Sequence, residues 1–183
     1  LVLKDYLKIA MVSPYDFTWP GGVAVHVSQL ARQFIKTGND VKILAPHTPS
    51  RDALEDGYFV PLGRSVPVPG GGSVARLSLS VWLHRRIKSI LAEEMFDVVH
   101  IHEPMMPVLP LSVIQHSKSL NVGTFHAVYG TFRNYGWSHP ILKYWFKRLD
   151  GRIAVSSAAE EYVSRYFPGD YRIIPNGIDV DHF

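Results

Sequence analysis

The sequence predicts an α/β domain with a Rossmann-like, doubly wound and mainly parallel sheet that carries helices on both faces. Two observations support this prediction. Short apolar runs alternate with helical patterns along the whole 183-residue chain, which is the order that builds strand-helix-strand units. Most of these runs are apolar on both faces, as strands covered from both sides are. The length suits one domain, because domains usually have about 100–200 residues.

Six strands are expected from the apolar runs, over residues 8–13, 40–45, 97–102, 122–125, 151–155 and 171–174. Five helices are expected between them, over residues 23–36, 76–94, 107–119, 140–149 and 157–166. In the first helix, apolar side chains recur at helical spacing and Gly38 follows as a stop signal. Residues 46–73 interrupt this order with five prolines and three successive glycines. That segment is expected to be mostly loop, with short extra strands over 58–61 and 66–68.

The composition excludes several classes of function. The chain has no cysteine, so it has no disulfide framework, thiolate nucleophile or thiolate metal site. It has no apolar stretch long enough to span a membrane, and its charged opening does not resemble a secretion signal. The net charge of +3 is too small to indicate nucleic acid, and no such partner is expected.

The charges are distributed unevenly along the chain. Residues 1–92 contain 11 Lys and Arg against 6 Asp and Glu, whereas residues 93–183 contain 8 against 10. This asymmetry indicates an anionic partner for the N-terminal half. Chance scatter over a solvated surface is the alternative.

A glycine-rich turn follows the first predicted strand, in the sequence SPYDFTWPGGVAVHVSQLA. Gly21 and Gly22 open the first helix at the carboxyl edge of the sheet, where ligands of open α/β folds bind. Two glycines there allow a backbone to approach a phosphate, and the helix dipole favours its charge. The pattern is neither a dinucleotide fingerprint nor a P-loop. The alternative is a turn with a purely structural role.

Two further strand ends carry histidine. His126 follows the strand 122–125 at the same edge, where it can exchange protons or only cap the strand. His100 and His102 alternate along the strand 97–102 and therefore share one face. A metal site would need a further ligand and supporting partners, so we expect no metal here. Instead the pair should pack near the strand end, with Glu103 at the rim of the cleft.

The expected helix 76–94 has an apolar face and a basic face. Leu79, Leu83, Ile87 and Ile90 share the apolar side at 100° per residue. The opposite side carries an exposed tryptophan with basic residues, as interfacial helices on anionic lipid do; an ordinary solvated face is the alternative. Arg76, at the start of this helix beside a glycine-rich loop, suits an anionic ligand group.

These motifs together resemble a known family. The opening with its glycine pair, DVVHIHEP, TFHA, GRIAVSS and IPNGIDVDHF are similar, in that order, to the N-terminal domain of retaining glycosyltransferases of family four, or group one, which have two Rossmann-like domains. Within that family the chain resembles the phosphatidylinositol α-mannosyltransferases, which share SPYxFxxPGG, HIHEP and GSVAR. The last of these corresponds to residues 72–76.

The resemblance implies transfer of mannose from GDP-mannose to an inositol phospholipid with retention of configuration, without a metal cofactor. It implies that Gly21 and Gly22 approach the donor diphosphate and that His126 lies beside the transferred sugar. Tyr15, Ser73 and Arg76 would contact the acceptor head group. The membrane-facing residues implied are Trp82, Arg85, Arg86 and Lys88. Retaining members are described as using a front-face attack that needs no carboxylate nucleophile.

Some positions depart from the family pattern. Residues 70–72 are more glycine-rich than expected, and Ala127 and Tyr129 stand where hydroxyl-bearing residues are common. The acceptor therefore stays open: another sugar or glycolipid is the alternative within the family. A stand-alone module that binds a phosphorylated ligand is the alternative outside it.

Domain organisation follows from the same resemblance. Residues 1–175 are expected to form the acceptor-binding domain and residues 176–183 to begin a linker to a C-terminal nucleotide-sugar-binding domain. The chain alone is expected to lack transferase activity. The implied location is the cytoplasm, at the inner face of the cell membrane.

Overall fold

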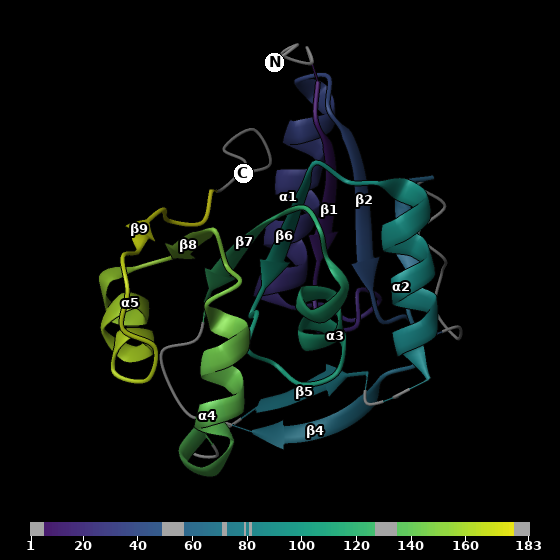
Figure 1. Ribbon diagram of the computed structural model, residues 1–183. Helices are drawn as coiled ribbons and strands as arrows, with labels where there is room; N and C mark the ends of the chain where they lie inside the picture. The colour runs from purple at the N-terminus through teal and green to yellow at the C-terminus, as the bar shows by residue number, and fades with distance from the viewer. Residues whose placement is uncertain are drawn as a thin grey trace.

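The computed structural model describes residues 6–48, 57–70, 73–78, 80, 82–126 and 135–177. Seven strands form one parallel sheet in the order β3-β2-β1-β6-β7-β8-β9, while β4 and β5 form a separate antiparallel hairpin (Figure 1). The strands are β1 Lys8–Val12, β2 Asp40–Ala45, β3 Phe59–Pro61, β4 Val66–Gly70, β5 Ser73–Leu77, β6 Val98–His102, β7 Leu120–Phe125, β8 Gly151–Ala154 and β9 Arg172–Ile173. The helices are α1 Gly22–Lys36, α2 Leu83–Glu94, α3 Leu109–His116, α4 Tyr135–Phe146 and α5 Ser157–Ser164. The predicted fold class is confirmed.

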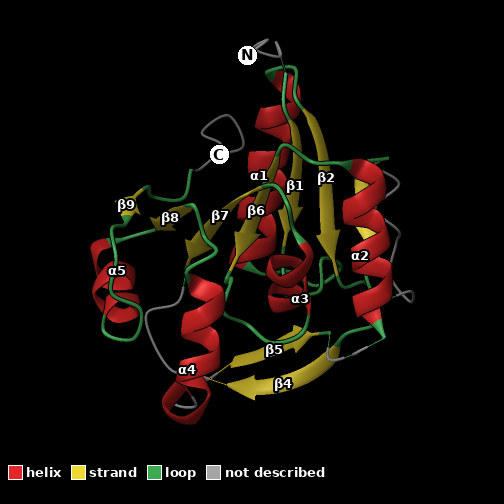
Figure 2. Ribbon diagram, in the orientation of Figure 1, coloured by secondary structure: helices red, strands yellow, loops and turns green. Residues whose placement is uncertain are grey.

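Helices cover both faces of the sheet. On one face, α1 packs Val27 and Ala31 against Met11 and Ile43. On the other face, α2, α3 and α4 lie together in front of the sheet in the view of Figure 2. Their buried residues, among them Ile87, Val113 and Phe146, share one cluster with Val99 and Ile101 of β6. Each fully buried side chain of this kind stabilises the fold by about 1.5–3 kcal/mol, so the two clusters hold the layers together.

The helix expected over 76–94 is wrong in its first part. Residues 73–77 form β5, and α2 begins only at Leu83. Arg76 therefore lies in a strand, opposite Pro67 of β4, and not at a helix start. Val66 and Val68 precede the adjacent glycines Gly71 and Gly72, and Val74 follows them; two glycines between strand-forming residues are a hairpin signal. The apolar spacing typical of a helix runs through Leu83, Ile87 and Ile90 and does not include the hairpin.

The extra strands expected near 58–61 and 66–68 are confirmed with slightly different ends. β3 joins the main sheet beside β2, which raises the expected six strands to seven. None of the described helices is long and apolar enough to cross a membrane.

The parallel register brings several strand ends to one edge. Val12 pairs with Ile101, and His102 pairs with Thr124. The residues that follow β1, β6 and β7 in sequence are therefore neighbours in space. The hairpin β4-β5 reaches the same edge through an isolated bridge between Tyr15 and Leu77.

Candidate active site at the carboxyl edge of the sheet

The turn that opens α1 leaves free space beside the helix N-terminus. Gly21 is the N-cap residue in an extended conformation, with no side-chain cap, and the first turn carries no acidic residue. A Cβ built at either Gly21 or Gly22 would meet no atom within 4 Å. Neither glycine is required by a close approach within the described part of the chain. Their small size therefore keeps the positive end of the helix dipole accessible to an anion.

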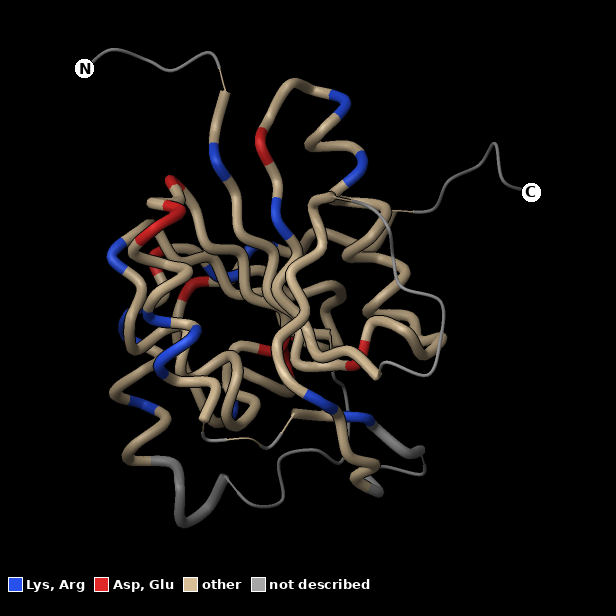
Figure 3. Tube along the Cα trace, turned by 90° about the vertical axis from the view of Figure 1, so that its right-hand side faces the viewer, with Lys and Arg blue, Asp and Glu red and all other residues tan. Residues whose placement is uncertain are grey.

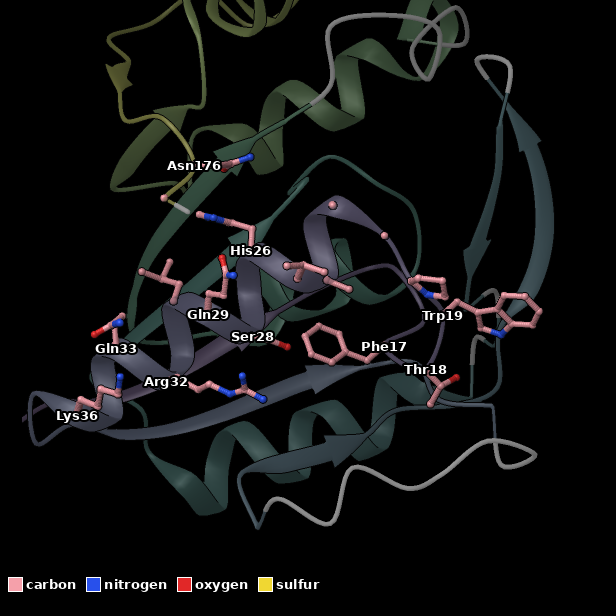
Figure 4. A pocket seen from close by; sticks show the side chains of 17 residues that line it. Phe17, Thr18, Trp19, His26, Ser28, Gln29, Arg32, Gln33, Lys36 and Asn176 are labelled. Carbon is pink, nitrogen blue, oxygen red and sulfur yellow. The ribbon is translucent and has the colours of Figure 1, made fainter. Parts of the chain in front are cut away.

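A large open pocket begins at this turn and runs along α1. Its volume is about 960 Å³, and it is lined by residues 17–22, by one side of α1 as far as Lys36, and by Asn176 and Gly177. Figure 4 shows His26 and Gln29 on the side of α1 that faces Asn176. Arg32 and Lys36 add positive charge at the far end. A pocket of this size can accommodate a ligand of several hundred daltons.

Arg76 lies against the same turn. Its guanidinium carbon is 3.9 Å from the centre of the Trp19 ring, which is a cation-π contact. The Arg76 carbonyl oxygen accepts a hydrogen bond of 2.9 Å from the backbone N–H of Asp16. Trp19 also lines the pocket, so the structure brings the predicted residue Arg76 close to the glycine turn. Ser73 lies at the start of β5, and its side chain is outside the described residues.

Tyr15 belongs to this group as well. It bridges to Leu77 of the hairpin, and its side chain is partly buried against the hydrophobic core. Burial, together with the negative charge of Glu103, raises the pKa of the Tyr15 hydroxyl above its usual value. The phenol is therefore a neutral hydrogen-bonding group at physiological pH.

Asp16 ties the loops around the turn together. Its carboxylate accepts hydrogen bonds from the hydroxyls of Thr18, Thr48 and Ser65, and from the backbone N–H of Thr18 at 2.9 Å. Burial raises the pKa of this carboxyl, but the hydrogen bonds outweigh burial and the net pKa is lowered. Asp16 is thus an ionised structural centre that fixes the turn next to Arg76.

Four histidines, one of which lines the pocket, are in contact with one another. His100 and His102 of β6 stack with ring centres 4.5 Å apart, and His102 Nδ1 lies 2.9 Å from His126 Nε2. His26 of α1 contacts the rings of both His102 and His126 at 5.6 and 5.3 Å. Because His26 also lines the pocket, it connects the pocket with His126. The sequence analysis missed His26, although it stands one helical turn after Gly22.

These histidines are neutral near pH 7. Burial lowers the pKa of His26, lowers that of His100 to about 4 and that of His126 to about 3, and lowers that of His102 well below its usual value. Electrostatic repulsion that would arise between protonated neighbouring histidines lowers the pKa of His100, His102 and His126 further. The cluster therefore offers hydrogen-bond donors and acceptors without net charge.

Glu103 is not at the rim of a cleft as expected. Its residue is only 2% exposed, and its Oε1 accepts a 2.7 Å hydrogen bond from the backbone N–H of His126. Its backbone adopts a positive φ of 50°, which is uncommon outside glycine. The Glu103 side chain is therefore buried in the interior of the protein, where its hydrogen bond holds the backbone of His126 in place. The expected packing of His100 with His102 at the strand end is confirmed.

The same histidines could hold a metal ion. Ring nitrogens of His26, His102 and His126 lie within 4.8 Å of one another. A metal-bound imidazole usually donates its second ring N–H to an acceptor. Within the described ranges, His102 Nε2 and His126 Nδ1 have no such partner. The 2.9 Å contact between His102 Nδ1 and His126 Nε2 already uses one nitrogen of each ring for hydrogen bonding, and a metal-free site stays a prediction.

The predicted membrane-facing residues lie on α2, apart from this cluster. Leu83 and Ile87 are buried, whereas Trp82 is 84% exposed and Arg85, Arg86 and Lys88 are all exposed. The expected division of the helix into an apolar and a basic face is confirmed for residues 83–94. Figure 3 shows Lys and Arg at several other places as well, so positive charge is not confined to α2.

Similarity to known proteins identifies the family. The model for Glycosyltransferase Family 4 matches residues 20–182. The chain belongs to glycosyltransferase family 4. The phosphatidyl-myo-inositol mannosyltransferase of Mycobacterium tuberculosis is 41% identical over 97% of this chain and 46% of its own length. That of Propionibacterium freudenreichii is 35% identical over 95% of this chain and 47% of its own. This family-4 chain thus spans about half the length of these curated relatives.

Solved structures support the fold of this family-4 chain. Sucrose-phosphate synthase from Thermosynechococcus elongatus superposes with a TM-score of 0.70 at 18% identity, covering 97% of this chain and 50% of that one. Anabaena HepE, in complex with UDP and glucose, gives 0.67 at 13% identity, covering 96% and 46%. At these identities the likeness establishes the fold alone. In both cases the superposed region is about half of the larger chain.

Proposed function

We propose that this chain is the acceptor-side domain of a glycosyltransferase that transfers a hexose to a phosphatidylinositol-like lipid. We further propose that the hexose is mannose, that the donor is GDP-mannose and that the anomeric configuration is retained. The single observation that carries the proposal is the meeting of two features at one edge of the sheet. The open N-terminus of α1 at Gly21 and Gly22 is joined through His26 to His126. The name of the mycobacterial relatives supports the acceptor.

The proposed donor contacts follow from charge. The diphosphate would lie at the N-terminus of α1, where a helix dipole and backbone N–H groups favour an anion. His126 would lie beside the sugar as a neutral hydrogen-bonding group, in keeping with its lowered pKa. In a front-face substitution the acceptor hydroxyl bonds to the anomeric carbon while the bond to the leaving phosphate breaks. The departing phosphate oxygen takes the hydroxyl proton, so no enzyme carboxylate nucleophile and no metal is required.

The proposed acceptor contacts are Tyr15, Ser73 and Arg76. Arg76 is held against Trp19, and a guanidinium in a fixed orientation suits the phosphate of an inositol lipid head group. Tyr15 supplies a neutral hydroxyl nearby. The role of Ser73 rests on its place in β5, three residues before Arg76.

We also propose that α2 binds the surface of an anionic membrane, at the inner face of the cell membrane. Its exposed Trp82 and three exposed basic residues suit the interface of such a bilayer. Helix α2 follows the hairpin that carries Arg76, so one contact would bring a lipid head group to the site.

A second domain would complete the enzyme. The relatives are about twice as long as this chain, and we propose that a C-terminal domain, joined through residues 176–183, binds the nucleotide of the donor. The 183-residue chain alone would then show no transfer. A different sugar or glycolipid acceptor is the alternative, because residues 70–72, Ala127 and Tyr129 depart from the family pattern. A stand-alone binding module is the alternative outside the family's chemistry.

The natural protein that contains this chain provides the test. With radiolabelled GDP-mannose and vesicles containing phosphatidylinositol, we expect labelled lipid to form. The Gly22→Val variant should fold normally, since a Cβ meets nothing there, but should lose at least about tenfold in donor affinity because the branched side chain displaces the phosphate. Gly57→Val is the matched control, at another glycine with open space.

Transfer of mannose to a soluble acceptor alone would contradict the proposed lipid acceptor. Unchanged donor affinity in Gly22→Val would contradict the diphosphate site, and micromolar GDP-mannose binding by the 183 residues alone would favour the module.

A further inference from the structure

The two oxygens of the Asp16 carboxylate bind different parts of the protein. Oδ1 accepts hydrogen bonds of 2.9 and 2.6 Å from the backbone N–H and the hydroxyl of Thr18, within its own loop. Oδ2 accepts hydrogen bonds from the hydroxyls of Thr48, which follows β2, and Ser65, which precedes β4. Asp16 is only 2% exposed. One buried group therefore connects three segments that are far apart in the sequence.

On the Oδ1 side, the carboxylate shapes the turn that leads to Trp19. The bond from the Thr18 N–H to the Asp16 side chain forms an Asx turn, in which the carboxylate imitates a backbone acceptor. The N–H of Trp19 donates a 3.4 Å hydrogen bond to the Asp16 carbonyl oxygen in the same turn. The direction in which the Trp19 ring projects therefore depends on the side chain of Asp16.

On the Oδ2 side, the carboxylate holds the base of the hairpin that carries Arg76. Ser65 directly precedes β4, and Pro67 of that strand pairs with Arg76 of β5. The backbone attaches the hairpin at two further points, through the bridge from Tyr15 and through the bond from the Asp16 N–H to the Arg76 carbonyl oxygen. These two attachments do not require a particular side chain at position 16. Removing the carboxylate would therefore leave the hairpin attached but release its base at Ser65.

Both sides lead to the contact between Arg76 and Trp19. Trp19 belongs to the turn held by Oδ1, and Arg76 belongs to the hairpin held by Oδ2. The guanidinium carbon of Arg76 is 3.9 Å from the centre of the Trp19 ring. A cation-π contact requires the cation to lie over the face of the ring, so a movement of either segment would misalign the guanidinium.

We propose that Asp16 is a positioning residue for the acceptor site: its carboxylate fixes the turn of Trp19 and the hairpin of Arg76 relative to each other, so that the Arg76 guanidinium is presented to an anionic group of the acceptor. The guanidinium is then ordered before the acceptor binds, which reduces the entropic cost of binding. This inference rests on the proposed function for the identity of the acceptor. The arrangement of Arg76 and Trp19 is a property of the protein without ligand.

Hydrogen bonds, and not an ion pair, hold the Asp16 carboxylate. In the described part of the chain, no basic residue forms an ion pair with it. In Asp16→Asn, the amide oxygen can still accept from the Thr18 N–H, and the amide NH2 can donate to the hydroxyl oxygens of Thr48 and Ser65, because a hydroxyl also accepts. Asp16→Asn should therefore preserve the positioning, whereas Asp16→Ala removes it.

Nuclear magnetic resonance of the natural protein, with nitrogen-15 in its arginines, tests the positioning without a ligand. A group over the face of an aromatic ring is shielded, so the side-chain N–H signal of Arg76 should lie upfield of its ordinary position in the wild type; Arg76→Lys assigns it. We expect this signal to return toward the ordinary position in Asp16→Ala and to remain shielded in Asp16→Asn. An unchanged signal in Asp16→Ala, or an equal change in both variants, would overturn the proposal.

Ser65→Ala and Thr48→Val are a matched pair that separates positioning from stability, and they replace Asp16→Ala if that variant does not fold. Each removes one hydroxyl donor from the same Oδ2, but only Ser65 adjoins the hairpin. Calorimetry with soluble inositol phosphate should show an affinity that is roughly 2- to 12-fold lower in Ser65→Ala, as for one lost hydrogen bond, and changed by less than about twofold in Thr48→Val. Equal losses in the two variants would contradict the proposal.

Steady-state kinetics gives a second readout that general destabilisation would not produce. Ser65→Ala should raise the KM for the lipid acceptor and leave kcat and the KM for GDP-mannose unchanged, because Ser65 is not attached to the glycine turn. A lower kcat with an unchanged acceptor KM would contradict a role in presenting Arg76.

The two proposals fail in different ways. If the Arg76 signal moves in Asp16→Ala but Arg76→Ala still binds inositol phosphate normally, Asp16 positions Arg76 and the proposed acceptor contact fails. If Arg76→Ala loses this binding but Asp16→Ala retains both the shielded signal and the affinity, the acceptor proposal stands and the inference about Asp16 fails.

Discussion

The guanidinium carbon of Arg76 lies 3.9 Å from the centre of the Trp19 ring. The two residues come from a strand of the hairpin and from the loop before α1, respectively, which are far apart in sequence. Trp19 lines the pocket that begins at the glycine turn, so the contact holds a cation beside a residue of that pocket.

Replacing Trp19 should therefore weaken binding of an anionic head group through Arg76. A cation-π contact contributes about 0.5–2 kcal/mol, so Trp19→Leu is expected to lower affinity for soluble inositol phosphate by roughly 2- to 30-fold, as measured by calorimetry. Trp82→Leu is the matched control, because Trp82 is 84% exposed on another element. Equal affinity in wild type and Trp19→Leu would show that Arg76 needs no support from the ring.

Acid should destabilise the fold through the buried histidines. The folded-state pKa of His100 is lowered from 6.5 to about 4 because the residue is buried and His26 lies nearby. Between these values the unfolded chain binds more protons than the folded chain, so the free energy of unfolding falls as pH falls from about 6.5 to 4 and is fully restored above 6.5. One such group contributes up to about 1.4 kcal/mol per pH unit in this window.

The variant His100→Gln isolates that contribution. Glutamine can still meet the Thr124 hydroxyl that His100 Nε2 contacts, but it does not titrate. Urea unfolding at several pH values should give a shallower slope between pH 6.5 and 4 than the wild type. Parallel slopes in the two proteins would mean that His100 is not protonated on unfolding.

Charge on α2 should control membrane binding. Replacing Arg85, Arg86 and Lys88 with alanine is expected to reduce flotation with anionic vesicles by an order of magnitude or more, since each basic residue near the surface contributes about 1 kcal/mol. The triple change at Lys118, Lys143 and Lys147 removes the same charge from other exposed positions and should have a smaller effect. If both variants lose binding equally, net charge and not α2 is responsible. If the wild-type protein floats equally well with neutral vesicles, membrane binding does not depend on the charge of the lipid, and the electrostatic explanation is wrong.

Gly123 should tolerate no side chain. A Cβ there would lie 2.8 Å from Leu149 Cδ1 and 2.9 Å from Pro104 Cγ, closer than real Cβ contacts. Gly123→Ala is expected to lower the free energy of unfolding by about 1–3 kcal/mol, measured by urea denaturation. Gly22→Ala, where the added Cβ meets nothing, should be neutral or stabilising. A neutral Gly123→Ala would show that Leu149 and Pro104 can move aside.

Removing metal ions should leave the enzyme active. Of the three histidines whose ring nitrogens lie within 4.8 Å, His102 and His126 form a hydrogen bond with each other. We therefore expect the natural protein to keep its transfer rate after dialysis against a chelator, with metal content checked by elemental analysis. Loss of activity that zinc alone restores would reassign His26, His102 and His126 as metal ligands.

Several parts of this site could be predicted from sequence because they depend on local pattern. The glycine pair before a helical repeat places α1 and its N-terminus, and the alternation of His100 with His102 places both on one face. His26 could have been suspected from its spacing after Gly22, but nothing local relates it to His126. The contact of Trp19 with Arg76 depends on how a hairpin folds back, and the hairpin itself was mistaken for the start of a helix.

The sequence by itself determined the α/β class, the parallel sheet and the family, because apolar periodicity and motif order are properties of the chain read in one dimension. Only the tertiary structure decided which side chains meet. Parallel pairing of β1, β6 and β7 sets their carboxyl ends at one edge, and burial there neutralises four histidines and draws Glu103 inward. Proton affinity and orientation depend on neighbours distant in sequence, so no local pattern encodes them.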